Sequence, residues 1–162
     1  MFHSVNALSK AIATALGAGY SPIAPGTCGT AVTVPLACAL APLNVWQYAL
    51  VVLAVIGIGI WAASRADRAW GTHDSGRIVI DEVAGYLATM TLVDRAHWAP
   101  LVVGFIVFRF LDIVKPPPIR WLDENLPGGV GVVIDDVAAG IVGMGIMVAL
   151  ARFGALAYLE GI

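Results

Sequence analysis

The chain alternates between long apolar segments and short stretches that are polar or rich in glycine and proline. Apolar residues at helical spacing predict a first helix, on a membrane surface or against a bundle: Val5, Leu8, Ile12 and Leu16. Longer apolar segments predict buried or membrane-embedded helices over residues 45–63, 78–93, 100–114 and 130–150. Residues 31–43 are apolar but short and contain Pro35, so we expect a kinked or partial crossing there.

The connecting segments have distinct characters. Gly17–Thr30 holds four glycines and two prolines, and we expect an irregular loop without a regular helix. Residues 64–77 are the most polar segment, and residues 94–98 are a short polar connection. The elements expected after residue 114 are a proline stop at Pro116–Pro118, a short surface piece at 119–125 and a hinge at Pro127–Gly129.

Composition turns this pattern into a membrane prediction. The 162 residues are 59% hydrophobic and only 12% charged, whereas soluble domains are about a quarter charged. The mean hydropathy is +0.86. We therefore predict one domain over residues 1–162. Its fold is expected to be an all-α polytopic membrane helical bundle with short interfacial helices and a Gly/Pro-rich loop.

Charge and cysteine content exclude other classes. The net charge is −2 and no basic run occurs, so no nucleic-acid partner is expected. Cys28 and Cys38 lie in apolar sequence without ligand-like spacing, which makes a disulfide or a metal role unlikely. The N-terminus lacks the pattern of a removable signal peptide.

The distribution of basic residues predicts the topology. If residues 31–63 form one hairpin and residues 83–108 a second, most basic residues face one side: Lys10, Arg65, Arg68, Arg77, Lys115 and Arg120. The positive-inside tendency places this side in the cytoplasm and residues 94–98 opposite. The acidic residues discussed next then lie at the cytoplasmic ends of helices.

Five acids interrupt apolar sequence at three places: Asp81-Glu82, Asp112 and Asp135-Asp136. An ionised carboxylate in a low-dielectric setting costs several kcal/mol unless a cation, proton or donor compensates it. A buried network of acids and arginines would explain any one of them, but all five together favour a functional site. Carboxylates from three helices, without a Cys or His cluster, fit Mg²⁺ better than Zn²⁺.

The metal ligands expected are Glu82, Asp112, Asp135 and Asp136, with Asp81 nearby. Adjacent helical residues diverge by about 100°, so one acid of each doublet should ligate directly. Arg109, Asp112 and Lys115 share one helical stripe and suggest an anion beside the cation, although a simple salt-bridge ladder explains the stripe equally well.

The Gly/Pro-rich loop is a second candidate for anion binding. Gly26 and Gly29 offer backbone donors, and Thr27 and Thr30 offer hydroxyls. A tight membrane turn is an equal alternative, because no lysine follows Gly29 as in a P-loop. His73 and Asp74 could serve acid–base chemistry, with surface solvation the simpler role for His73.

Three blocks together resemble the bacterial phosphatidylglycerophosphatase A family of membrane lipid phosphatases. They are Gly19–Thr30, His73-Asp74 followed by Ile78–Tyr86, and Phe108–Arg120 continuing to Gly128–Gly140. The resemblance covers roughly residues 17–145. It implies an all-helical core and Mg²⁺-dependent hydrolysis of the terminal phosphate of phosphatidylglycerophosphate, giving phosphatidylglycerol.

The resemblance does not settle which acid does what, but the residues allow a mechanism and a location to be proposed. Asp81, Glu82, Asp112, Asp135, Asp136 and Asp74 are the expected catalytic acids. Arg109, Lys115, Thr27, Thr30, Gly26, Gly29 and His73 are expected to bind the substrate. Water is preferred over an aspartate as the nucleophile. The protein is expected in the bacterial inner membrane with its site facing the cytoplasm, and its oligomeric state stays open. A small ion or proton transporter and a structural membrane subunit are the rivals.

Overall fold

The computed structural model describes residues 2–72 and 75–161, and His73 and Asp74 lie outside this part of the chain. The elements in order are α1 (Phe2–Ala13), the 3-10 helix η1 (Ala15–Tyr20), α2 (Pro25–Ala39), α3 (Val45–Trp70), α4 (Ile80–Thr89), α5 (Trp98–Val114), α6 (Ile119–Asn125), α7 (Gly128–Arg152) and α8 (Ala155–Glu160). The described residues contain no strand. The all-α prediction is confirmed.

Two helices are long and apolar enough to cross a membrane. α3 has 26 residues and α7 has 25, each with a mean hydropathy of 2.0 in its most apolar window. At about 1.5 Å per residue, each exceeds the roughly 30 Å hydrocarbon core of a bilayer. Asn44 caps α3 by accepting from the backbone N–H groups of Trp46 and Gln47.

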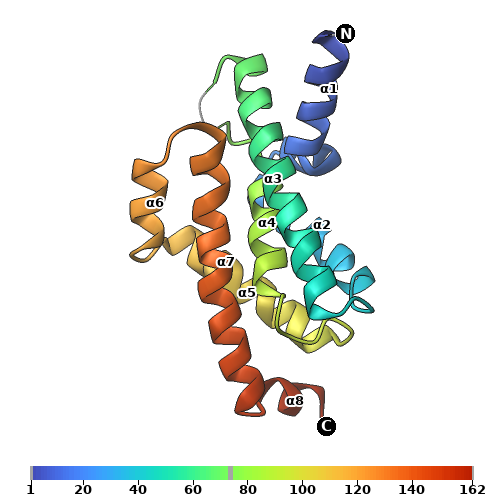
Figure 1. Ribbon diagram of the computed structural model, residues 1–162. Helices are drawn as coiled ribbons and strands as arrows, with labels where there is room; N and C mark the ends of the chain where they lie inside the picture. Colours follow the sequence, from blue (N-terminus) through green and yellow to red (C-terminus); the bar gives the residue numbers. More distant parts are fainter. Residues whose placement is uncertain (1, 73–74, 162) are drawn as a thin grey trace.

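The short helix α4 forms the centre of the bundle, between α3 and α7 (Figure 1). It packs most extensively against α7, and glycines allow the close approach. A Cβ at Gly140 would lie 2.3 Å from the Gly85 carbonyl oxygen, and one at Gly85 would lie 2.6 Å from the Asp136 carbonyl oxygen. Two buried tyrosines stabilise the C-terminal half of α4. Tyr48 donates a hydrogen bond to the Leu87 carbonyl, and Tyr86 donates one to the Leu101 carbonyl.

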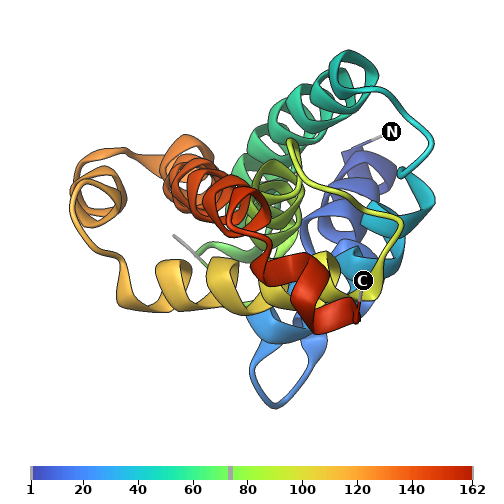
Figure 2. The ribbon, with the colours of Figure 1, turned by 90° about the horizontal axis from the view of Figure 1, so that it is seen from below.

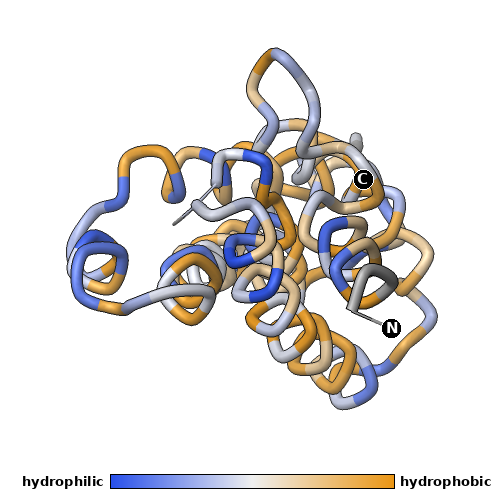
Figure 3. Tube along the Cα trace, turned by 90° about the horizontal axis from the view of Figure 1, so that it is seen from above, coloured by the Kyte–Doolittle hydropathy of each residue, from blue (hydrophilic) through white to orange (hydrophobic). Residues whose placement is uncertain are grey.

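The remaining helices surround this centre. Seen from below, α5 runs across the bundle under α4, and α6 stands at its far end (Figure 2). Most of the chain is hydrophobic, whereas hydrophilic residues are concentrated in α6 and near the middle of the bundle (Figure 3).

Arg95 ties together the two loops at the end of α4 that is remote from its acids. Its guanidinium donates to the carbonyls of Met90 at 2.9 Å and Leu43 at 3.1 Å, and also to those of Thr91 and Val93. It also lies 4.0 Å from the centre of the Tyr48 ring. This buried cation therefore joins residues 40–44 to residues 90–95.

Several sequence-based boundaries were wrong. The expected irregular loop ends early, because α2 already begins at Pro25, where a proline loses no helical hydrogen bond. α3 continues through the start of the polar segment to Trp70, and α7 begins at Gly128 in the expected hinge. The 119–125 piece is helical, and α8 was not predicted.

Candidate active site

The five acids singled out from the sequence line one cavity of about 350 Å³ at the beginning of α4. Arg109, Lys115 and Gly26 also line it, together with Asp123 of α6. The walls come from the start of α2, the last turn of α5, α6 and the first half of α7. The structure thus joins Gly26 and Asp136, which are 110 positions apart in the chain.

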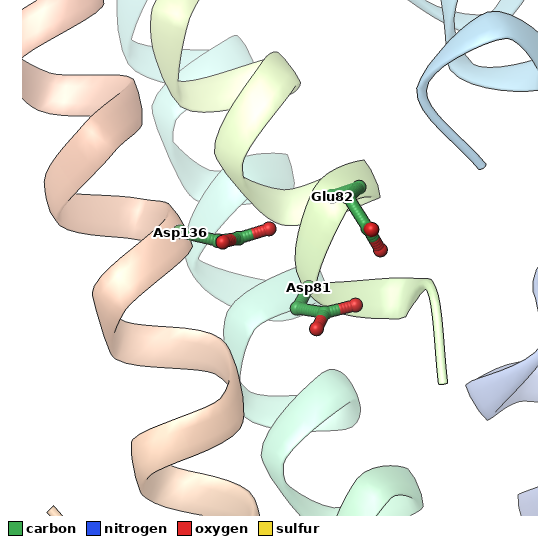
Figure 4. Close-up of side chains that lie close together, drawn as sticks. All are labelled: Asp81, Glu82 and Asp136. Carbon is green, nitrogen blue, oxygen red and sulfur yellow. The ribbon is translucent and has the colours of Figure 1, made fainter. Parts of the chain in front are cut away.

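Three of these acids form a tight cluster. Asp81 and Glu82 occupy the first turn of α4, and Asp136 reaches toward them from α7 (Figure 4). Each offers one carboxylate oxygen, and these oxygens lie within 4.8 Å of one another. The amino end of a helix stabilises nearby negative charge, which favours Asp81 and Glu82 at this position.

Each acid of this cluster has a buried oxygen without a hydrogen-bond partner in the part of the chain that the structure describes. Asp81 Oδ1, Glu82 Oε2 and Asp136 Oδ2 are buried without a hydrogen-bond partner among the described residues. Such carboxylate oxygens carry a large desolvation cost unless a cation compensates it. An all-oxygen donor set is also what Mg²⁺ prefers. The residues present therefore fit a divalent magnesium ion.

Arg109 lies beside this cluster. Its Nη1 donates to Asp112 Oδ2 at 2.5 Å, and it lies 3.4 Å from Glu82 Oε1. Its Nε has no partner among the described residues and is buried. Gly26 faces the same pair, because a Cβ there would lie 1.9 Å from Glu82 Oε1 and 3.1 Å from Arg109 Nη1. The first turn of α2 thus closes over the guanidinium and the carboxylate.

Lys115 holds the other side of the cavity. It is the C-cap of α5, in a left-handed conformation just before the prolines, and is not on the helical stripe that the sequence predicted. Its Nζ donates to Asp135 Oδ2 at 2.6 Å and to Asp123 Oδ1 at 2.8 Å. Partial burial alone would lower the pKa of Lys115, but these two carboxylates raise it, so the side chain stays charged.

Comparison with known proteins places this chain in a family. Residues 11–151 match the family described as Phosphatidylglycerophosphatase A. The chain belongs to this family. Its relatives include the Phosphatidylglycerophosphatase A of Escherichia coli (strain K12), which is 41% identical over 84% of this chain and 79% of its own length. The Haemophilus influenzae protein of the same name is 35% identical over 80% of each chain.

A third relative carries a different name. The Bacteroides thetaiotaomicron protein named "Putative phosphatidylinositol-3-phosphatase" is 39% identical over 88% of this chain and 92% of its own length. No solved structure matches the chain. The names of these relatives therefore differ in the lipid headgroup that they mention.

The two acid doublets behave differently from each other. Asp135 and Asp136 diverge as expected on a helix, since Asp135 binds Lys115 and Asp136 joins the cluster. Asp81 and Glu82 both belong to the cluster, because they lie at the start of α4 where both side chains reach the same space. Asp112 stays beside the cluster in contact with Arg109.

The glycine loop contributes less than expected. Among the described lining residues, Gly26 reaches the cavity but Thr27, Gly29 and Thr30 do not. Helix α2 explains this correction: the Thr30 hydroxyl donates to the Gly26 carbonyl, and Gly29 packs against Val79. The roles predicted for His73 and Asp74 fall outside the described residues.

Sequence reasoning missed Asp123. The only signal was its place in a short polar helix just beyond Lys115, because neither an apolar neighbourhood nor a doublet marks it.

Proposed function

We propose that this protein hydrolyses the terminal phosphate of phosphatidylglycerophosphate, yielding phosphatidylglycerol and inorganic phosphate. The observation that carries the proposal is the cluster of Asp81, Glu82 and Asp136 beside Arg109 and Lys115 in one cavity. Clustered carboxylates suit a cation, and two basic side chains suit a phosphate. The names of the Escherichia coli and Haemophilus influenzae relatives supply the substrate.

Magnesium is the proposed cofactor, held by Asp81, Glu82 and Asp136, with Asp112 and Asp135 within the same cavity. The unpaired oxygens of the cluster support this assignment. Bound Mg²⁺ would supply neutralisation of phosphate charge and a more acidic water.

The basic residues are proposed to bind the phosphate. Arg109 can engage two phosphate oxygens at once through its planar guanidinium, while Lys115 acts as a point charge. In the structure, both basic side chains contact carboxylates. When substrate enters, each of these carboxylates would either bind the metal or continue to support the basic side chain. Asp135 and Asp123 hold the Lys115 ammonium at the cavity wall.

The amino end of α2 is proposed to face the leaving oxygen. Its first backbone N–H groups have no intrahelical acceptor, and Gly26 lines the cavity. The absence of a side chain at Gly26 lets substrate and Glu82 approach this helix end. Donors fixed in this way stabilise charge that develops in a transition state. Water is the proposed nucleophile.

A lipid substrate accounts for the surroundings of the cavity. We propose that α3 and α7 cross the bacterial inner membrane in a multi-pass arrangement and that the cavity opens toward the cytoplasm. The cavity volume of about 350 Å³ suits a phosphorylated headgroup, while the acyl chains stay in the bilayer. A transporter would need acids on both sides of a pore, whereas these five line one cavity.

An assay on purified protein tests the proposal. Phosphate release from phosphatidylglycerophosphate should exceed that from phosphatidic acid and phosphatidylinositol-3-phosphate, and should vanish when Mg²⁺ is chelated. Glu82→Gln, Asp112→Asn and Asp136→Asn should each lower turnover by about 10²–10³, the range seen when a transition-state contact is removed.

The exposed acid Asp94, in the loop opposite the cavity, provides the matched control. Asp94→Asn should keep turnover near the unmodified value. Near-normal turnover in all three cavity variants would refute the proposed site, and equal rates on every lipid would refute the proposed substrate.

A further inference from the structure

A second group of basic residues lies apart from the cavity, on two aromatic rings. Lys10 Nζ is 5.3 Å from the centre of the Trp70 ring, and the Arg77 guanidinium is 5.8 Å from the same centre. Arg77 also lies 6.0 Å from the Tyr20 ring. Two cations thus contact one indole.

Neither cation is neutralised within the part of the chain that the structure describes. No salt bridge there involves Lys10 or Arg77, although Lys10 does reach the Ala69 carbonyl at 3.5 Å. Positive charges without an acidic partner attract an anion, and aromatic rings favour cations that are partly desolvated. This arrangement suits an anionic group beside these cations.

A cavity is available beside these residues. Lys10 and Tyr20 line a space of about 440 Å³ together with Thr14, Leu16 and Gly17. The volume is comparable to that of the catalytic cavity, but no described acid lines it. It therefore has the opposite charge character.

The neighbouring surface is apolar and exposed. Leu16 is 88% exposed and Ile23 is 78% exposed, and the left-handed conformation of Ala15 and Leu16 turns this segment outward. The connection between α1 and α2 projects away from the other helices (Figure 2). Apolar side chains beside Lys, Arg, Trp and Tyr are typical of the headgroup boundary of a membrane.

We propose that Lys10 and Arg77, with Tyr20 and Trp70, bind the phosphate of an anionic phospholipid that is not the substrate. The exposed Leu16 and Ile23 favour a lipid over free phosphate, because only a lipid environment covers them. The inference rests on the membrane location proposed above and not on the hydrolytic activity.

The bound lipid would also lie close to the catalytic cavity. Gly76 and Ile78 line the catalytic cavity, and Arg77 between them turns to the aromatic rings on the other side. The Arg77 carbonyl packs against Gly19, where a Cβ would lie 1.9 Å away. A lipid held by Arg77 thus contacts the outer side of one wall of the cavity.

Native mass spectrometry of the full chain in detergent tests the proposal. Phosphatidylserine is the probe, because its phosphodiester is no substrate for a phosphomonoesterase, and phosphatidylcholine is the neutral comparison. The chain should retain phosphatidylserine in preference. Lys10→Gln with Arg77→Gln should weaken this binding about 30-fold, since each cation near an anionic lipid contributes about fivefold. The charge-matched pair Arg120→Gln with Arg152→Gln should change it less than twofold.

Several results would overturn the inference. These are equal loss in both pairs, no preference for phosphatidylserine, or displacement of the lipid by millimolar inorganic phosphate. If the glutamine pair does not fold, the exposed Arg77→Gln alone should still show the fivefold loss. Phosphatidylserine binding without hydrolysis of phosphatidylglycerophosphate would refute the proposed function only, and hydrolysis without this binding would refute the inference only.

Discussion

Gly140→Ala offers a direct test of how the fold builds the acidic cluster of Asp81, Glu82 and Asp136. The added Cβ would lie 2.3 Å from the Gly85 carbonyl oxygen and 2.9 Å from the Ala88 Cβ, about 1 Å short of ordinary contact. The obstacle is helix backbone, which cannot rotate away as a side chain can. α7 must therefore move from α4 by roughly 1 Å, because tightly packed interiors transmit such strain.

That displacement acts on the acids. Asp81 and Glu82 ride on α4 and Asp136 on α7, and their nearest oxygens lie within 4.8 Å of one another. A magnesium ion held by this cluster would need an oxygen from each of the three acids at bonding distance. Separating the helices by a further 1 Å leaves Asp136 out of reach. A misplacement of this size costs about 10²-fold in rate.

The chain should still fold. Overpacking costs about 1–3 kcal/mol, while replacing glycine by alanine in a helix returns about 1 kcal/mol. Turnover should be measured against Mg²⁺ concentration, together with the melting temperature in detergent. Gly145→Ala is the control, because Gly145 lies on the same helix with open space around it. Unchanged turnover and magnesium dependence in Gly140→Ala would show that helix spacing does not set the cluster.

Three further outcomes are expected. Arg109→Lys keeps the charge but loses the planar fork of the guanidinium. The lipid concentration needed for half-maximal turnover should therefore rise about tenfold or more, while the dependence on magnesium concentration stays unchanged. The reverse pattern would assign Arg109 to the metal. A cysteine at Ser75, in a chain without native cysteines, should react with a reagent confined to the cytoplasmic side and one at Ala96 from the other, and labelling from one side would contradict the topology. Arg95→Lys should lower the free energy of unfolding by about 2–3 kcal/mol, because several charge-assisted hydrogen bonds are lost; an unchanged denaturation midpoint would contradict this role.

The acids of the site were predictable because their surroundings are apolar. Asp81, Glu82, Asp112, Asp135 and Asp136 stand out against hydrophobic neighbours, and the structure brings all five to one cavity. A buried carboxylate needs a reason, so its position in the sequence is informative. Asp123 was not predictable on this ground, because it lies in polar sequence and gains its place only through Lys115.

The glycine loop shows where residue preferences mislead. Glycine and proline disfavour a helix interior, yet Pro25 stands where a helix can begin, and Gly26 and Gly29 let α2 approach α4 closely. The sequence shows the composition of this segment, but it does not show that α4 packs against it and favours a helical conformation. Lys115 is a second example, because its left-handed backbone at the C-cap of α5 is not indicated by the helical spacing of the sequence.

The burial of α4 has a consequence for how the protein is made. α4 has ten residues, too few to cross a bilayer, where about 20 are needed, and two of them are acids. Its short length and the two acids in its first turn make this helix a poor candidate for insertion by itself. Its main packing partner, α7, is synthesised almost fifty residues later. We therefore expect α4 to reach its final depth only after α7 has left the ribosome, which makes completion of the catalytic cavity a late event in biogenesis.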